Sequence, residues 1–488
     1  MTSTSDEAFK RSTLQGLYWT AIEASLRTAF QFGITVALAR LLSPEEFGIV
    51  AIVYLFAQIG WVFVEGGFSS ALVQQRDVDD REMSAIFHFQ WMFALVMALV
   101  LNLASPWIAE FYGIPVLDPL IRVLALTIIL NALGGVHRSL LERALAFREL
   151  MIAGLISTVV AGVLAVYLAF NGAGVWALAI QALVSSAISV VLLWVFHPWR
   201  PRMVFRPSLL KRTFSFGQYL LLSGILEALY GRLYGLVIGK MYGPADLGQY
   251  NRAITTQSML GNLLTGIVAR VAFPAFCAIK EDQPRVIAGL RKAVVGVMAI
   301  NIPVMLGLLA VAEPLVLTLF GEVWMPSVPL LRILCLSGLL WPMHMINMDV
   351  LLAQGYSRLF FQLEVAKKTL GTILFVAALP FGLEALAWSQ VLYAVACFLI
   401  HSRYTERMLG YNWLAQVMDC LPWLIAGAVM SGLVWLLHIV LEWPVLLELP
   451  IQVVFGAAIY LTFWILWDAS LLRQMAGALF SRPKIDAP

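Results

Sequence analysis

The chain carries one short motif twice, and this repetition constrains its fold more than any other feature of the sequence. Segment 39–48 reappears as segment 239–248 with four positions identical or alike: Arg40 and Lys240, Pro44 and Pro244, Glu46 and Asp246, and Gly48 and Gly248. Each copy follows a long apolar run and begins another. The motif therefore predicts a tight turn between two membrane-length helices, once in each half of the chain.

Two further matches follow in the same order. Pro119–Leu126 returns 210 residues later as Pro329–Leu336, and Gly174 with Ala177–Ala179 returns 208 residues later as Gly382 with Ala385–Ala387. We therefore expect two related lobes, with the functional site between them.

The composition sets the environment of these helices. Hydrophobic residues make up 61% of the chain and charged residues 12%, whereas a soluble domain has about 25% charged residues. Apolar runs of about 20 residues, enough to cross a hydrocarbon core, recur along the chain. These features predict an all-α polytopic membrane protein of about 14 transmembrane helices. The predicted spans are 14–41, 45–71, 84–111, 118–138, 150–171, 174–196, 214–241, 246–273, 287–311, 326–353, 359–381, 383–402, 414–440 and 446–468.

The positions of Lys and Arg predict how the chain is oriented. They cluster in alternate loops, at 76–81, 138–148, 200–212, 280–292 and 403–407, and are nearly absent from the loops between. Cytoplasmic loops carry such an excess. We therefore expect a multi-pass membrane protein with both termini cytoplasmic, and an uncleaved first span after the polar residues 1–12.

The repeats also predict the domain limits. Residues 1–198 would form an N-terminal lobe of six spans, residues 199–408 a C-terminal lobe of six, and residues 409–488 two appended spans with a cytoplasmic tail. The proline-rich segment 197–212 opposes helix continuation and reads as the linker between lobes. Six spans per lobe make the two repeats parallel, so that the lobes are pseudo-symmetric.

Enzyme motifs are missing from the sequence. The four cysteines form no CxxC pair, and the six histidines never stand at metal-ligand spacing. Most histidines fall near inner helix ends, where we expect a solvated, interfacial role. No phosphate-cradling loop is present. We expect no enzymatic activity, no metal, no cofactor and no nucleic-acid partner.

Charge within the predicted spans is the remaining signal, because it is costly in a membrane and usually functional. Cationic side chains are predicted to bind substrate in a cavity: Arg27, Arg232, Arg252, Arg270, Lys367 and Lys368. Acidic side chains are the candidates for ion coupling: Glu23, Glu65, Glu227, Asp349 and Glu364. Four cations near outer helix ends match in pairs through the repeat and are predicted to form an outer gate: Arg40, Lys240, Arg122 and Arg332.

Two interpretations of these charges stay open. Glu23 and Arg27 share a helical face, as do Glu364 and Lys368, so each pair can simply be neutral within the bundle. Alternatively, the first, seventh and eleventh spans line a hydrated cavity between the lobes, and its cations meet an anionic substrate.

Three segments carry a resemblance to a known family: Leu41–Ala51, Glu65–Gln74 and Ile238–Ala253. They resemble Wzx-type polysaccharide flippases of the colanic-acid exporter kind, in the multidrug/oligosaccharidyl-lipid/polysaccharide (MOP) exporter superfamily. The resemblance implies two six-helix lobes around a central cavity. It further implies alternating access that moves polyprenyl-pyrophosphate-linked oligosaccharides from the cytoplasmic to the periplasmic leaflet.

Expected partners are the lipid-linked oligosaccharide, membrane lipids and the polymerase or chain-length machinery of a surface polysaccharide. Two alternatives share parts of this expectation. A cation-coupled drug or small-solute antiporter would have the same fold but favour acidic cavity residues. A non-transporting scaffold of a polysaccharide assembly complex would need no charge at membrane depth.

Overall fold

The computed structural model describes residues 28–65, 79–202, 231–440 and 444–480. Contacts between these residues divide the chain into two units, Met1–Gly248 and Gln249–Pro488. The lobe limits predicted from the repeat, at residues 198 and 408, stay a prediction.

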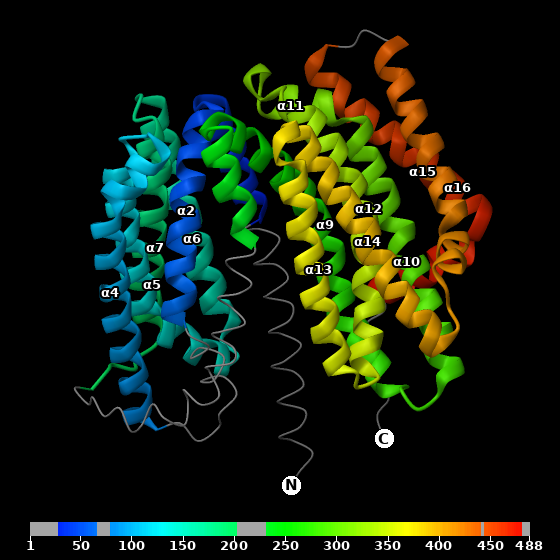
Figure 1. Ribbon diagram of the computed structural model, residues 1–488, viewed down its shortest axis with the longest axis horizontal. Coiled ribbons are helices and arrows are strands. Elements are labelled where there is room, and N and C mark those ends of the chain that lie inside the picture. Colours follow the sequence, from blue (N-terminus) through cyan, green and yellow to red (C-terminus); the bar gives the residue numbers. More distant parts are fainter. Residues whose placement is uncertain (1–27, 66–78, 203–230, 441–443, 481–488) are drawn as a thin grey trace. The chain divides into compact units, whose positions relative to one another are not determined.

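The first unit is a bundle centred on one helix. Its long helices are α2 (Pro44–Glu65), α4 (Asp80–Tyr112), α5 (Leu117–Arg143), α6 (Phe147–Phe170) and α7 (Val175–Phe196). α5 packs against α2, α4 and α7, and α6 packs against α7 (Figure 1). Residues 28–41 and 231–241 are also helical.

The second unit continues from α9 and has a similar plan. Its elements are α9 (Pro244–Ala278), α10 (Gln283–Ala310), α11 (Ala312–Leu319), α12 (Ser327–Ala353), α13 (Ser357–Ala378), α14 (Leu383–Leu409), α15 (Trp413–Val440) and α16 (Val445–Phe480). α12 packs against α10 and α14, and α14 packs against α13. The last two long helices join this bundle through α15, which packs against α10 and α16.

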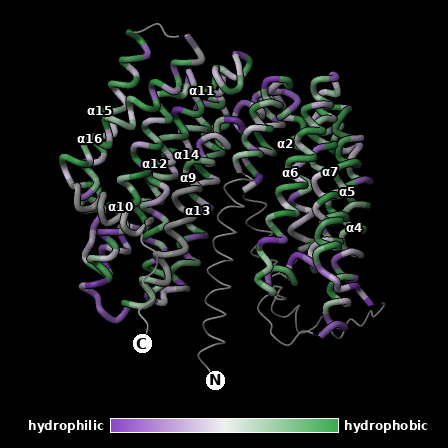
Figure 2. The backbone as a smooth tube through the Cα atoms, turned by 180° about the vertical axis from the view of Figure 1, so that it is seen from behind, coloured by the Kyte–Doolittle hydropathy of each residue, from purple (hydrophilic) through white to green (hydrophobic). Residues whose placement is uncertain are grey.

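These helices confirm an all-α polytopic membrane protein. Within the described residues, nine helices are long and apolar enough to cross a membrane, and their limits fall near the predicted spans. The full count of about fourteen stays a prediction. Figure 2 shows hydrophobic residues along the helices and hydrophilic residues gathered towards the connecting loops. The sequence reading missed two short elements before α12 in the described part, the helix α11 and the 3-10 helix η1 (Glu322–Trp324).

The surface of the bundle is apolar and much of its interior is lined by small residues. In α6 the buried positions Ala153, Ser157, Ala161, Ala165 and Ala169 recur every fourth residue, whereas Phe170 is 79% exposed. Small residues let helices approach closely where lipid, rather than water, surrounds them.

The repeated turn is held by capping and by a close backbone contact. Ser43 Oγ accepts from the backbone N–H of Glu46, whose carboxylate accepts from the backbone N–H of Ser43 at 2.7 Å, which is a capping box. A methyl group at Gly48 would lie 1.7 Å from the carbonyl oxygen of Pro244. One at Gly248 would lie 2.0 Å from the carbonyl oxygen of Pro44. The two copies of the turn thus contact each other reciprocally, and only glycine fits at both crossing points.

Prolines inside helices leave backbone carbonyls without their helical N–H donor, and in α10 and α12 a side chain replaces it. In α4, Ser105 Oγ lies 2.8 Å from the Asn102 carbonyl, four residues before Pro106, but its single proton cannot serve both this carbonyl and the Asp118 carboxylate that it also contacts. Tyr460 donates to the Ala299 carbonyl at 2.8 Å, four residues before Pro303. Asn301 donates to the Gly338 carbonyl at 3.1 Å, four residues before Pro342. Such replacement is required because an unpaired carbonyl is costly inside a membrane.

Candidate functional site

A largely buried ion pair stands near the middle of α13. Lys367 is only 4% exposed, and its Nζ lies 2.5 Å from Oε1 of Glu364, one turn earlier. The same ammonium lies 3.2 Å from the Met348 sulfur on α12. The sequence reading paired Glu364 with Lys368, which lies on the same helical face, and spacing alone does not choose between the two lysines. That pairing stays a prediction.

Two histidines lie next to this pair. His344 of α12 and His401 of α14 stack with ring centroids 5.2 Å apart, and they are 6% and 0% exposed. Lys367 is close enough to interact electrostatically with both rings. The expectation of solvated histidines near inner helix ends is therefore wrong for His401, as it is for His137, which is fully buried in the first unit. Within the described residues no group of His, Cys, Asp or Glu is arranged to hold a metal ion.

A second polar group, close by in the second unit, is satisfied within itself. Gln416 exchanges hydrogen bonds with Asn347 at 2.9 and 3.2 Å, and Thr405 donates to Asn347 Oδ1 at 2.8 Å. All three side chains are buried. Since its members bond to one another, this network joins α12, α14 and α15 without needing a ligand. Asp349, two residues beyond Asn347, is half-buried.

Arg252 of α9 is enclosed by aromatic rings. Its guanidinium carbon lies 4.7 Å from the centre of the Phe320 ring and 4.5 Å from that of Trp324. Both rings come from the segment after α11, and Arg252 is 6% exposed. These cation–π contacts pin the outer part of α9 to this segment.

In the first unit the cations lie at the surface or half-buried. Arg232 donates to Oε1 of Gln58 on α2. Lys240 donates to the Phe111 carbonyl, and its ammonium lies 4.5 Å from the centre of that residue's ring. Arg40 is exposed on the turn. Contacts with α2 and the end of α4 thus fix the helical residues 231–241 to the first unit.

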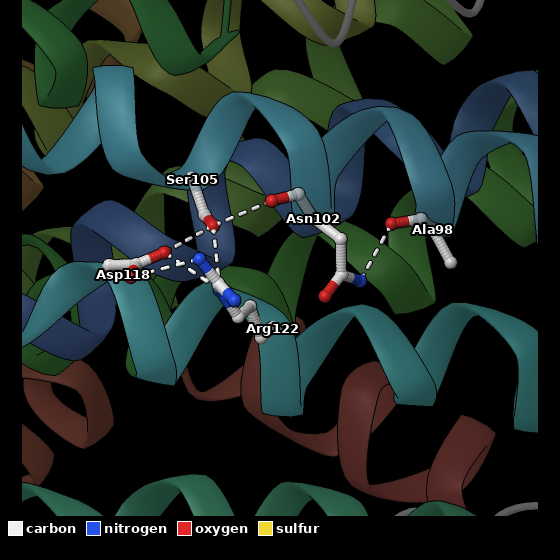
Figure 3. A network of polar contacts seen from close by, with 5 residues as sticks. All are labelled: Ala98, Asn102, Ser105, Asp118 and Arg122. Atoms are coloured by element: carbon white, nitrogen blue, oxygen red, sulfur yellow. Dashed lines mark hydrogen bonds and ion pairs between the residues drawn. The ribbon is translucent and has the colours of Figure 1, made fainter.

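Arg122 and Arg332, matched by the repeat, bind different partners. Arg122 forms a two-pronged contact with Asp118, at 2.8 and 3.1 Å, and Ser105 of α4 donates to the same carboxylate (Figure 3). In the second unit Val328 stands at the position of Asp118. Arg332 instead reaches Glu313 of α11, at 3.2 Å.

The remaining predicted residues are outside what the structure describes. Arg27, Glu23 and Glu227 lie outside the described residues. Glu65 ends α2 and Arg270 lies in α9, but their side chains are not described. The roles assigned to all the predicted residues stay predictions.

The first unit also contains a polar hollow between α5, α6 and α7. Its volume is about 390 Å³, and Asn131, the Arg138–Glu142 ion pair and several hydroxyls line it. Among these hydroxyls are Ser157 and Thr158 of α6. Under the 210-residue offset of the repeat they occupy the positions of Lys367 and Lys368.

Comparison with known proteins identifies the relatives of this chain. Residues 37–329 match the model of a family described as "Polysaccharide biosynthesis protein". The succinoglycan biosynthesis transport protein ExoT of Rhizobium meliloti (strain 1021) is 30% identical over 98% of both chains. The lipopolysaccharide biosynthesis protein WzxC of Escherichia coli (strain K12) is 27% identical over 77% of this chain and 76% of its own.

Solved structures show the same fold at low sequence identity. The lipid II flippase MurJ, in an inward closed conformation, matches with a TM-score of 0.72 over 93% of this chain and 99% of its own, at 14% identity. A multidrug resistance MATE family transporter of the MOP superfamily, inward-facing, matches with a TM-score of 0.62 over 80% and 99% of the two chains, at 15% identity. With a multi-pass helical fold, a family model that covers more than half of its length and a relative aligned end to end, this chain belongs to the polysaccharide biosynthesis protein family.

Proposed function

We propose that this protein flips oligosaccharides linked to polyprenyl pyrophosphate from the cytoplasmic to the periplasmic leaflet, by alternating access, and has no enzymatic activity. The similarity to a succinoglycan transport protein, and the fold shared with a lipid II flippase, support this cargo class. The observation that carries the proposal is Lys367, a cation kept 4% exposed inside a membrane-spanning bundle.

The physical need for such a protein lies in the cargo. Each sugar hydroxyl costs several kcal/mol to place in hydrocarbon without a hydrogen-bond partner. The pyrophosphate is costlier still because it is charged. A path with polar and cationic side chains lowers both costs while the lipid tail stays in the bilayer.

Within this proposal the cations divide into two groups. Arg232, Lys367 and Lys368, together with Arg27 and Arg270, contact the pyrophosphate, arginine being suited to two-pronged phosphate contacts. Arg252 holds α9 in place through its two rings. Asp349 and Glu364 are the described candidates for ion coupling, with Glu23, Glu65 and Glu227 beside them.

The test is export in a strain lacking the gene, scored by surface polysaccharide and by the lipid-linked precursor that accumulates inside. We expect wild type to restore export, and both Arg232→Ala and Lys367→Ala to reduce it about tenfold or more, the effect of losing one charge-assisted hydrogen bond. Lys280→Ala, on an exposed loop, is the matched control. A wild-type chain that leaves the precursor inside would overturn the proposal.

The ion pair allows a sharper test of the role of Lys367. In the double variant Glu364→Lys with Lys367→Glu, the attraction is kept and the cation is displaced by one turn. If Lys367 meets the cargo, this protein folds but exports poorly. Full export by the double variant would show that the Glu364–Lys367 pair has a structural role and does not contact the cargo.

We further propose that both termini are cytoplasmic in the bacterial inner membrane and that six-span lobes 1–198 and 199–408 precede appended segment 409–488. A phosphatase reporter, active only in the periplasm, should stay inactive when fused after Pro488. Activity there would reverse the orientation. Contacts with polymerase or chain-length proteins belong to the same proposal and are tested by crosslinking in cells.

A further inference from the structure

The second unit contains a cavity of about 240 Å³ between α9, α10, α12 and α14. Its polar lining comes mainly from three carboxamides, Gln257, Asn301 and Gln390, and from hydroxyl groups. The indole of Trp341, 46% exposed, lies at its edge. No residue lining this cavity carries a charge.

The cavity depends on a break in α12. Pro342 has no N–H to offer the Gly338 carbonyl, and Asn301 of α10 supplies the missing donor: its Nδ2 lies 3.1 Å from the carbonyls of both Gly338 and Leu339. Because both partners are acceptors, the amide nitrogen must face them. The orientation of Asn301 is therefore fixed by chemistry, and its Oδ1 points away from α12.

That Oδ1 atom is the second observation. Asn301 is fully buried and lines the cavity, yet its Oδ1 has no hydrogen-bond partner among the described residues. A buried acceptor without a donor is costly. Because Asn301 has no exposed surface, a donor held in the cavity reaches this oxygen only after neighbouring side chains move.

Gly338 makes room for a further amide. A methyl group at this position would lie 2.2 Å from Nε2 of Gln257 and 2.8 Å from the sulfur of Met305. The bare backbone at Gly338 thus admits the Gln257 carboxamide, whose one hydrogen bond within the part of the chain that the structure describes is to the weak acceptor Met305 sulfur at 3.7 Å. Its amide stays available to a ligand.

The first unit has no counterpart to this arrangement. Under the 210-residue offset, Ile128 and Ala132 of α5 stand at the positions of Gly338 and Pro342. α5 therefore has neither the freed carbonyl nor the space. The break is present in α12 and absent from its repeat counterpart α5. If both halves needed such a break in order to fold, both helices would have it.

We propose that this cavity binds one uncharged sugar ring of the cargo, an inference that rests on the proposed function. Carboxamides such as those of Gln257 and Gln390 both donate to and accept from sugar hydroxyls. The indole offers an apolar face with a polar edge. The volume lies below the roughly 300–1,000 Å³ of pockets for drug-sized ligands, which suits one ring. With no charged lining, a pyrophosphate or a uronic acid is disfavoured.

The test measures binding of methyl glycosides of glucose, galactose and mannose to the full chain in nanodiscs, by saturation-transfer NMR. Inorganic pyrophosphate and methyl glucuronate are the charged comparators. We expect at least one neutral glycoside to bind, and Gln257→Leu and Gly338→Ala to weaken it about fivefold, the effect of one neutral hydrogen bond. Gly296→Ala, whose added methyl would meet nothing within 4 Å, is the matched control and should bind like wild type.

Two readouts separate the possible failures. Neutral glycosides that bind wild type and both variants equally, or none that binds at all, would overturn the sugar site even if the wild-type chain exports normally. Pyrophosphate binding that is lost in Gly338→Ala would overturn it in favour of an anion site. If wild type fails to export its precursor, the proposed function fails instead, whatever the glycosides do. Gln257→Leu keeps the test valid should Gly338→Ala not fold.

Discussion

α6 and α13 occupy the same place in the two repeats, yet only α13 carries charge at membrane depth. Gly154, Ser157 and Thr158 of α6 stand where α13 has Glu364, Lys367 and Lys368. Ser157 and Lys367 are equally buried, at 4% exposed. A lysine at the centre of a membrane helix costs about 2.5–3.5 kcal/mol on insertion scales. Since α6 packs without it, the fold does not need the charge, and the difference points to function.

The repeated turns, unlike α6 and α13, are alike in both halves. Changes in them are expected to have the largest effect, which is on folding. Gly48→Ala and Gly248→Ala each place a methyl group against backbone, which cannot move aside as a side chain can. We expect both variants to lose nearly all folded protein and to do so equally, measured by fluorescence-detected size exclusion. Gly33→Ala, with nothing within 4 Å, should fold normally. A well-folded Gly48→Ala protein would show that the two turns do not cross as described.

Next in size is the conversion of α13 towards α6. The triple variant Glu364→Ala, Lys367→Ser, Lys368→Thr should insert and fold, because it copies a helix that already does. Export should fall about tenfold or more, since charge-assisted contacts to the cargo are lost. Thr369→Ala, at an exposed position of α13, serves as the control in the same export assay. Normal export by the triple variant would mean that the charged residues that distinguish α13 from α6 are not needed for export.

A smaller effect, on thermal stability, separates the loss of the ion pair from the loss of the charges themselves. Lys367→Ser alone removes the ammonium that lies against Glu364. Breaking a fully buried pair costs about 3 kcal/mol or more, and the cost is smaller here because the Glu364 side chain is 27% exposed. The single variant should therefore unfold at a lower temperature than the triple variant, in which the carboxylate is gone as well. Thermal unfolding of the two purified proteins decides this. The reverse order would show that Glu364 is satisfied by other groups.

The smallest effect concerns the matched arginines. Arg122→Gln and Arg332→Gln each remove an ion pair at a partly exposed site, worth up to about 1 kcal/mol. Arg122 has the two-pronged partner and Ser105, so its loss should lower the unfolding temperature more. Equal shifts in unfolding temperature would indicate that the two-pronged contact of Arg122 is no stronger than the single contact of Arg332.

The helices and the repeated turn could be predicted from the sequence because both are local. An apolar run of about 20 residues or a Pro-x-x-x-Gly motif is visible without knowing the fold. α11 was missed because an eight-residue helix leaves no such signal. The capping box at Ser43 was within reach of sequence reasoning, since Glu46 follows it at the required spacing.

The candidate site was predicted only in part. Charge at membrane depth located Lys367 and Glu364, but spacing left their pairing open. The stacked rings of His344 and His401 come from helices 57 residues apart, and Gln58 meets Arg232 across 174 residues. No periodicity reports such contacts. The role of Asn301 could not be predicted from the sequence. It depends on an amide of α10 lying beside the proline break of α12, and the contact between these two helices is known only from the structure.

The reciprocal contact of the two turns bears on how such a chain arose. Pro44 meets Gly248 while Pro244 meets Gly48. The same patch of the motif therefore contacts its own repeat copy. Twofold homodimers have interfaces of this kind, in which one patch recognises its own copy. A chain of half this length, carrying the turn once, would already have paired with itself through it. Gene fusion would then have kept the contact and freed each half to diverge, one keeping serine where the other gained lysine.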